Sequence, residues 1–413
     1  MSRTLSIVII VGSVLLALAL LGGLVWANTV YIRAHPLEKD FLVPWLAART
    51  FIQYGQSPYS DPATQRAQIQ YYGRLAQPGE DPLALWLPFP VELFYFPFAL
   101  ITNYAIARGL WLALLELALL ALAYLSLQLT SWKPPVTFLP FLGLFSVFGV
   151  FGLLSSSSSS GLGFLALALG GFLLALHEER DELAGALLFV ALFEPRFTGV
   201  FFVLVFWWII FQRRMRVIWG FLMGLVFLLV LSFFLLPDWF LPFLRGLFSH
   251  AAYFHGRSLF DILAGWSPVI GPRLGWAILV VVALVLFVEW GIVLQRDFRH
   301  FMWIVSVTLV ATPFLGIPIN IKDYVFLFIP LVLFLSILAE RFSRPRRWGA
   351  AEFTFLGVAL GLWLLTVLLV GINALGAWTD VMFLGLPGLL LIGLYWMRWW
   401  FVRPVRTELG LSE

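Results

Sequence analysis

Long apolar runs recur from one end of the chain to the other, and they limit its fold more than any other feature. The first covers residues 5–27, and runs of similar length cover 105–129 and 217–236. About 20 apolar residues in a helix cross a bilayer core of roughly 30 Å. With 62% hydrophobic and 12% charged residues, the chain lacks the roughly 25% charge of a soluble globular protein. We therefore predict an all-α, polytopic membrane helix bundle, and not a barrel of alternating ten-residue strands.

We predict about twelve spans, counted from the apolar runs. The other nine runs cover 136–154, 161–176, 183–193, 197–211, 274–294, 301–315, 324–339, 353–372 and 382–401. The runs 183–193 and 197–211 are short and flank a charged Glu-Pro-Arg sequence, so they form either one kinked helix or two short helices. Two helices meeting at a charged elbow fit the charge distribution better.

Basic residues in the short loops set the orientation. Clusters at 213–216, 296–299 and 341–347 fall on one side when the amino terminus is placed inside the cell. Because basic loops stay cytoplasmic, both termini are predicted in the cytoplasm of a multi-pass cell-membrane protein. The net charge of +4 belongs to these loops, so nucleic-acid binding is not predicted.

A long first outer loop, residues 28–104, separates the first span from the second. The run 5–27 exceeds the apolar core of a signal peptide, which favours an uncleaved span. Apolar positions at three- and four-residue spacing (Phe41, Trp45, Ala48 and Ile52) predict an interfacial helix with Arg49 and Gln53 toward water. Gly55 and Pro58 end it.

The rest of the outer loop is divided between a surface helix and a proline-rich stretch. Residues 62–75 predict a second helix lying on the surface. The apolar residues 83–102 contain or adjoin four prolines, namely Pro82, Pro88, Pro90 and Pro97. Because proline breaks helical hydrogen bonding, this stretch is predicted to be interfacial or re-entrant and not to cross the bilayer.

Asp40 is the residue at which the sequence suggests chemistry. It follows the first span and stands at the mouth of the membrane-embedded part. An acid in such a place is either functional or the N-terminal cap of the following helix. The chain has no cysteine, so disulfides, thiolate metal sites and cysteine nucleophiles are excluded.

The first outer loop carries a resemblance to a known family. The sequence from Asp40 to Tyr59, DFLVPWLAARTFIQYGQSPY, and the aromatic FYFP at 94–97 resemble the GT-C polyprenol-phosphate-dependent glycosyltransferases. The group of mannosyl- and arabinofuranosyltransferase-like membrane proteins called glycosyltransferase family 87 is the most similar. Weaker similarities to the same family lie at Glu194-Pro195-Arg196, at GRSLFDI (residues 256–262) and at KDYVFLFIP (residues 322–330).

The resemblance implies a GT-C-like module over residues 1–340, followed by a helical pair and cytoplasmic tail at 341–413. It implies that Asp40 is the catalytic base and that the sugar comes from a polyprenyl-phosphate donor in the membrane. A positioned carboxylate activates an acceptor hydroxyl, and cations stabilise the phosphate leaving group. The substrate-binding residues implied are Tyr59, Arg196, His255, Arg257 and Lys322, and His250 is a further candidate cation.

Two departures from the family pattern favour a different function. Six serines, Ser155 to Ser160, replace a polar family motif, and Glu194 stands where the family has lysine. An anion near a phosphate works against donor binding unless Arg196 or Lys322 pairs with it. The alternative is a catalytically degenerate GT-C-fold scaffold subunit in a complex with other membrane subunits. A transporter is not favoured, because no internal repeat is evident.

No cofactor is predicted beyond the lipid-phosphate sugar donor, which is a substrate. His250, His255 and Asp261 suggest a divalent metal, but the five-residue histidine spacing does not place both rings on one helical face. No metal site is therefore predicted. The partners predicted are membrane lipid and the polyprenyl-phosphate sugar.

Overall fold

The computed structural model describes residues 3–35, 37–149, 160–253, 256–342, 349–371 and 375–402. Within these ranges the regular structure is helical apart from one isolated bridge between Arg257 and Ile319. The chain divides into two compact units. Unit 1 comprises Met1–Leu117, Ser156–Gly161 and Val226–Phe254, and unit 2 comprises Ala118–Ser155, Leu162–Leu225 and His255–Glu413.

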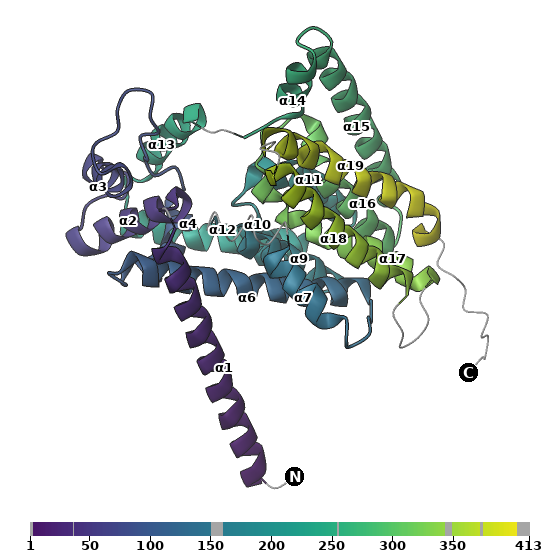
Figure 1. Cartoon of the computed structure of the whole chain (residues 1–413), viewed down its shortest axis with the longest axis horizontal. Coiled ribbons are helices and arrows are strands. Elements are labelled where there is room, and N and C mark those ends of the chain that lie inside the picture. The colour runs from purple at the N-terminus through teal and green to yellow at the C-terminus, as the bar shows by residue number, and fades with distance from the viewer. Residues whose placement is uncertain are drawn as a thin grey trace. The chain divides into compact units, whose positions relative to one another are not determined.

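Unit 1 contains the first helix and the outer loop (Figure 1). Its elements are α1 (Arg3–Arg33), α2 (Lys39–Tyr54), α3 (Asp61–Tyr72), α4 (Phe89–Glu92), η1 (Leu93–Tyr95), α5 (Phe96–Ala99) and α13 (Phe240–Tyr253). Two further helices, α6 (Tyr104–Thr130) and α12 (Met215–Leu235), pass from one unit into the other.

The remaining helices belong to unit 2. They are α7 (Leu139–Phe148), α9 (Leu162–His177), α10 (Asp181–Ala191), α11 (Pro195–Phe211), α14 (Leu259–Trp266), α15 (Gly271–Val293), α16 (Phe298–Ala311), η2 (Thr312–Leu315), η3 (Ile321–Leu327), α17 (Phe328–Phe342), α18 (Ala350–Gly371) and α19 (Leu375–Val402). The predicted two-helix elbow is confirmed, because Leu192–Glu194 separate α10 from α11.

Seven helical stretches in the described residues are long and apolar enough to cross a membrane, which makes the chain a multi-pass membrane protein. They are Val11–Arg33, Tyr104–Thr130, Met215–Leu235, Gly271–Val293, Phe298–Leu315, Ile321–Phe342 and Met382–Phe401. Four other apolar stretches, such as Leu162–His177, are only 10–17 residues long. The all-helical membrane class is confirmed, while the count of twelve spans stays a prediction.

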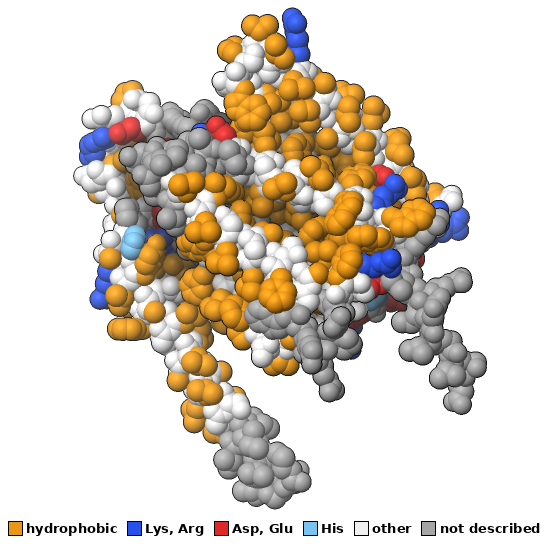
Figure 2. Space-filling model, turned by 45° about the vertical axis from the view of Figure 1, so that its right-hand side comes forward, with side chains coloured by type: hydrophobic (Ala, Val, Ile, Leu, Met, Phe, Trp, Pro, Cys, Tyr) orange, Lys and Arg blue, Asp and Glu red, His pale blue; other side chains and the backbone are white. Residues whose placement is uncertain are grey.

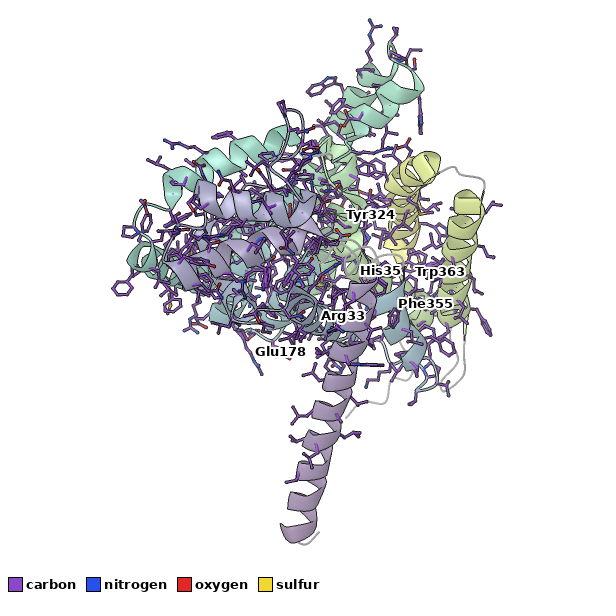
Figure 3. The ribbon with its side chains drawn as sticks, turned by 60° about the vertical axis from the view of Figure 1, so that its left-hand side comes forward. Arg33, His35, Glu178, Tyr324, Phe355 and Trp363 are labelled. Atoms are coloured by element: carbon purple, nitrogen blue, oxygen red, sulfur yellow. The ribbon has the colours of Figure 1, made fainter. Side chains whose placement is uncertain are left out.

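The core of unit 2 forms around α16 and α17. Every residue of α16 from Phe301 to Ala311 is buried, as expected for a helix that is apolar on all sides. Its polar side chains bond within the core: Thr308 Oγ1 donates to the Ile304 carbonyl at 2.8 Å and accepts from Trp290 Nε1 at 2.9 Å. Phe355 of α18, labelled in Figure 3, packs at this core, whereas Trp363 on the same helix is 42% exposed.

Small residues allow α10 and α12 to approach closely within unit 2. A Cβ added to Gly185 would lie 2.0 Å from the Val217 carbonyl oxygen, and one added to Gly220 would lie 2.1 Å from that of Glu182. Backbone contact through glycine is a common way for helices to pack in a membrane.

In unit 1, α1 leaves most of its surface uncovered, and Figure 2 shows hydrophobic side chains along it. Its last turns make the contacts. Asn28 Nδ2 donates to Glu116 Oε2 of α6 at 3.0 Å, and Gly109 of α6 lies against Thr29. Figure 3 shows Arg33 and His35 at this end of the helix.

The helices predicted within residues 28–104 are confirmed, while their position at the interface and on the outer side stays a prediction. The expected helices at 41–52 and 62–75 correspond to α2 and α3. The stretch 83–102 has no helix long enough to cross a bilayer. It folds instead into α4, η1 and α5, which we call the Phe89–Ala99 segment. Its Pro90 and Pro97 both stand at the beginning of short helices, where proline is tolerated.

Candidate functional site

Asp40 lies in the first turn of α2 and is partly exposed. An acid there interacts favourably with the positive end of the helix dipole. The helix ends at Gly55, which adopts a left-handed conformation with φ of 61° while its N–H donates to the Phe51 carbonyl at 3.0 Å. The end of α2 is therefore defined by glycine, as the sequence predicts.

The predicted faces of α2 need a correction. Phe41, Trp45 and Ala48 are buried inside unit 1, whereas Ile52 is 38% exposed. Arg49 does not simply turn to water, because its Nη1 donates to the Ala99 and Ile101 carbonyls at 3.3 and 3.2 Å. The short turns that follow the prolines leave carbonyls without helical partners, and a nearby guanidinium satisfies them.

The Phe89–Ala99 segment is fastened to α2. Trp45 Nε1 donates to the Phe98 carbonyl at 3.0 Å, beside the bonds from Arg49. Aromatic rings fill the space around Phe41, which contacts Tyr95 and Trp111 at centroid distances of 6.1 and 5.5 Å. The helix that carries Asp40 is thus held by both hydrogen bonds and aromatic packing.

A buried cation lies near the beginning of α2. Arg108 on α6 is 2% exposed and interacts with the Tyr104 side chain. The Tyr104 hydroxyl accepts from the backbone N–H of Glu38 at 3.3 Å, two residues before Asp40. A buried guanidinium supplies positive charge in unit 1 that the prediction had sought only in later loops.

Glu92 is the least expected residue of unit 1. It is fully buried at the end of α4, and neither carboxyl oxygen has a hydrogen-bond partner. The backbone amide of Ala48 on α2 faces it, but not with hydrogen-bonding geometry. Burial raises the pKa of Glu92 well above its ordinary value, and the amide of Ala48 opposes this only in part. Burial therefore favours the neutral carboxylic acid over the carboxylate at this position.

Two tyrosines accompany Glu92. The Tyr59 hydroxyl, predicted to bind substrate, donates to the Leu87 carbonyl at 2.7 Å. Burial, with the charge of Glu92, raises the pKa of Tyr59, and burial with the charges of Glu92 and Asp40 raises that of Tyr95. Tyr95 thus lies within electrostatic range of both acids. Asp40, Tyr95, Glu92 and Tyr59 make up the candidate site of unit 1.

Lys39 and Arg49 are the basic residues of α2. Lys39 Nζ lies 2.7 Å from Asp81 Oδ2, and Arg49 binds main-chain carbonyls. Burial alone lowers the pKa of Lys39, but the bond to Asp81 and the charges of Asp81 and Asp40 outweigh it, so that the pKa rises. Each basic residue thus has a partner other than Asp40.

Arg196 and Lys322, predicted to bind substrate, belong to a charged cluster in unit 2. Arg196 Nε lies 3.0 Å from Glu194 Oε1, so arginine pairs with the unexpected glutamate. The charges of Glu194, Lys322 and Arg196 all act on Asp323, which is buried. The cluster holds two acids and two bases, and its charges balance.

Arg257 is also engaged within unit 2. Its backbone exchanges hydrogen bonds with Ile319 at 2.9 and 3.1 Å, and its guanidinium forms an ion pair with Asp380 of α19. Asp261, weighed as a metal ligand, accepts instead from the Ser258 N–H at 2.9 Å and caps α14. His255 and Ser155 to Ser159 lie outside the described residues, as does the His250 side chain.

The predicted site residues are divided between the two units. Asp40 and Tyr59 belong to unit 1, whereas Arg196, Arg257 and Lys322 belong to unit 2. Convergence of these cations on Asp40 therefore stays a prediction. The sequence analysis missed Glu92 and Arg108. Both are charges inside apolar stretches, which is the pattern that could have identified them.

Comparison with known proteins adds no relative. No family model, no curated protein and no solved structure matches the chain. The interpretation of the site therefore depends on its own residues.

Proposed function

We propose that the protein is a membrane glycosyltransferase that transfers a sugar from a polyprenyl-phosphate donor to an acceptor hydroxyl at the outer face. The resemblance of the first outer loop suggests it. The structural observation that carries it is the position of Asp40. It stands in the first turn of a helix that hydrogen bonds and aromatic contacts hold against the Phe89–Ala99 segment, in a unit that also contains the buried Arg108.

The proposed reaction needs a base, an acceptor and a leaving group. Asp40 takes the proton of the acceptor hydroxyl, and the oxygen attacks the anomeric carbon of the sugar. The bond between that carbon and the phosphate oxygen breaks, and polyprenyl phosphate leaves with the electron pair. Cations stabilise the phosphate, with Arg108 as the candidate in unit 1 and Arg196, Arg257, His255 and Lys322 as the earlier candidates.

Asp40→Asn tests the proposal, because the substitution keeps the shape and removes the base. A general base contributes roughly 10²- to 10⁴-fold to a rate. We expect loss of labelled sugar transfer from polyprenyl-phosphate donors, measured in membrane vesicles, with unchanged expression. Asp61→Asn is the matched control, since Asp61 is also an acid in the first turn of an outer-loop helix. Transfer that survives in Asp40→Asn removes Asp40 from catalysis.

A scaffold subunit with a lost donor site is the second candidate function. The observation that favours it is the pairing of Arg196 with Glu194 and of Arg257 with Asp380, which neutralises two predicted phosphate-binding cations. Absence of transfer in the unmodified protein, together with co-purification of other membrane subunits, supports this candidate.

A further inference from the structure

Glu92 is buried in a way that works against stability. Its carboxyl oxygens lack hydrogen-bond partners among the described residues, and no part of the side chain is exposed. Leaving a buried polar group unpaired destabilises a fold, and a leucine of similar size has no such effect. A buried side chain that destabilises the fold because it lacks hydrogen bonds, and that a ligand can supply with them, indicates a binding site.

The surroundings of Glu92 are suited to a ligand with hydroxyl groups. A neutral carboxylic acid both donates and accepts a hydrogen bond, and so do the hydroxyls of Tyr59 and Tyr95. Tyr95 also stacks on Trp111 at a centroid distance of 4.7 Å, so an aromatic cluster adjoins these polar groups. Alcohols and sugars offer the same combination of donors and acceptors.

Glu92 lies in a segment made of short helices. The Phe89–Ala99 segment consists of three helices of four residues or fewer. The bonds of Trp45 and Arg49 to Phe98, Ala99 and Ile101 hold its carboxyl end to α2, whereas Glu92 belongs to its first helix. Local opening of a short element costs less free energy than unfolding of the whole fold.

We propose that Glu92, with Tyr59 and Tyr95, forms a binding site for a polyhydroxyl ligand such as a sugar, between α2 and the Phe89–Ala99 segment. This inference rests on the proposed function, because Tyr95 connects the site to Asp40 and the ligand is then the acceptor. The segment moves as the ligand enters, and the ligand hydroxyls supply the hydrogen bonds that Glu92 lacks.

The experiment uses the full chain in phospholipid nanodiscs and hexyl β-D-glucoside as the probe. Binding is followed by tryptophan fluorescence, since Trp111 stacks on Tyr95. We expect saturable binding in the unmodified protein, an affinity at least tenfold weaker in Glu92→Leu, and a loss of no more than about threefold in Glu92→Gln, which keeps a donor and an acceptor. The thermal unfolding midpoint verifies that both variants fold.

Other outcomes overturn the inference. Glucoside affinity that is unchanged in Glu92→Leu reduces Glu92 to a structural residue, and absence of glucoside binding in the unmodified protein rules out the site. Tighter binding of hexyltrimethylammonium, which shares the alkyl chain but has no hydroxyl, identifies a cation site instead. Binding needs no donor, so Glu92-dependent glucoside binding without any transfer contradicts only the proposed function.

Discussion

Glu92 in unit 1 and Glu194 in unit 2 are both buried glutamates, yet their surroundings differ. Glu194 bonds Arg196 and belongs to a cluster whose charges balance. Glu92 has no hydrogen-bond partner. A charge that is paired within the fold is consistent with a structural role, while an unpaired acid remains available to a ligand. The contrast favours residues 28–104 as the place of the proposed site and a structural role for the cluster of unit 2.

The strongest test of this contrast is the pH dependence of stability. Above the ordinary pKa of about 4.5, the unfolded chain loses the Glu92 proton while the folded chain, with its raised pKa, keeps it. Stability should therefore fall as pH rises above 4.5 toward neutrality, by up to about 1.4 kcal/mol per pH unit. Tyr59 and Tyr95, the titratable groups on which Glu92 acts, stay neutral in this range. Glu92→Gln should abolish this slope in thermal unfolding midpoints.

Glu80→Gln is the matched control for this measurement. Hydrogen bonds from Arg74 and the Gln77 backbone lower the pKa of Glu80 to about 2. Its contribution to stability is present above pH 4.5 and is lost only as pH falls toward 2, so the slope between pH 5 and 8 should not change. A Glu92→Gln protein that retains the wild-type slope contradicts the assignment of a neutral Glu92.

A smaller effect is expected from breaking the ion pair of unit 2. Arg196→Gln leaves Glu194 mostly buried without its charged partner, which should cost about 1–3 kcal/mol, because Arg196 is partly exposed. The double variant Glu194→Gln with Arg196→Gln should recover most of this loss. Equal destabilisation in the single and double variants, measured by unfolding midpoint, would show that the Glu194–Arg196 ion pair does not stabilise the fold.

The smallest effect is expected at an exposed pair of unit 1. Arg74 and Glu80 lie 2.7 Å apart, with side chains 45% and 30% exposed. Exposed ion pairs contribute little, because water and salt screen them. Arg74→Gln should leave the unfolding midpoint at pH 7 unchanged within error. A shift as large as that of Arg196→Gln indicates that pairing alone, and not burial, determines how much stability is lost when an ion pair is broken.

Much of the helical architecture follows from the sequence. Apolar runs define α6, α12 and α15 to within a few residues, and glycine defines the end of α2. Ile52 shows the limit of periodicity. Its spacing assigned it to the apolar face, but the Phe89–Ala99 segment packs against Phe51 and leaves Ile52 exposed.

The site was less predictable than the fold. Tyr59 and Asp40 were identified from a local pattern, whereas the burial of Glu92 depends on how a proline-broken segment packs against α2. No periodic pattern encodes that packing. The pairing of Glu194 with Arg196 was anticipated as a condition for donor binding. The ion pair of Arg257 with Asp380 joins residues 123 positions apart, and no local sequence pattern predicts it.

The length of α1 has a mechanical consequence. Its 31 residues extend about 46 Å, roughly 16 Å beyond the hydrocarbon thickness of a bilayer. The excess must be accommodated by tilt or by projection into the headgroup layer, the response known as hydrophobic mismatch. The contacts of Asn28 and Thr29 with α6 couple that tilt to the helix on which α2 packs. We therefore expect acyl-chain length to change the tilt of α1 and, through α6, the position of α2.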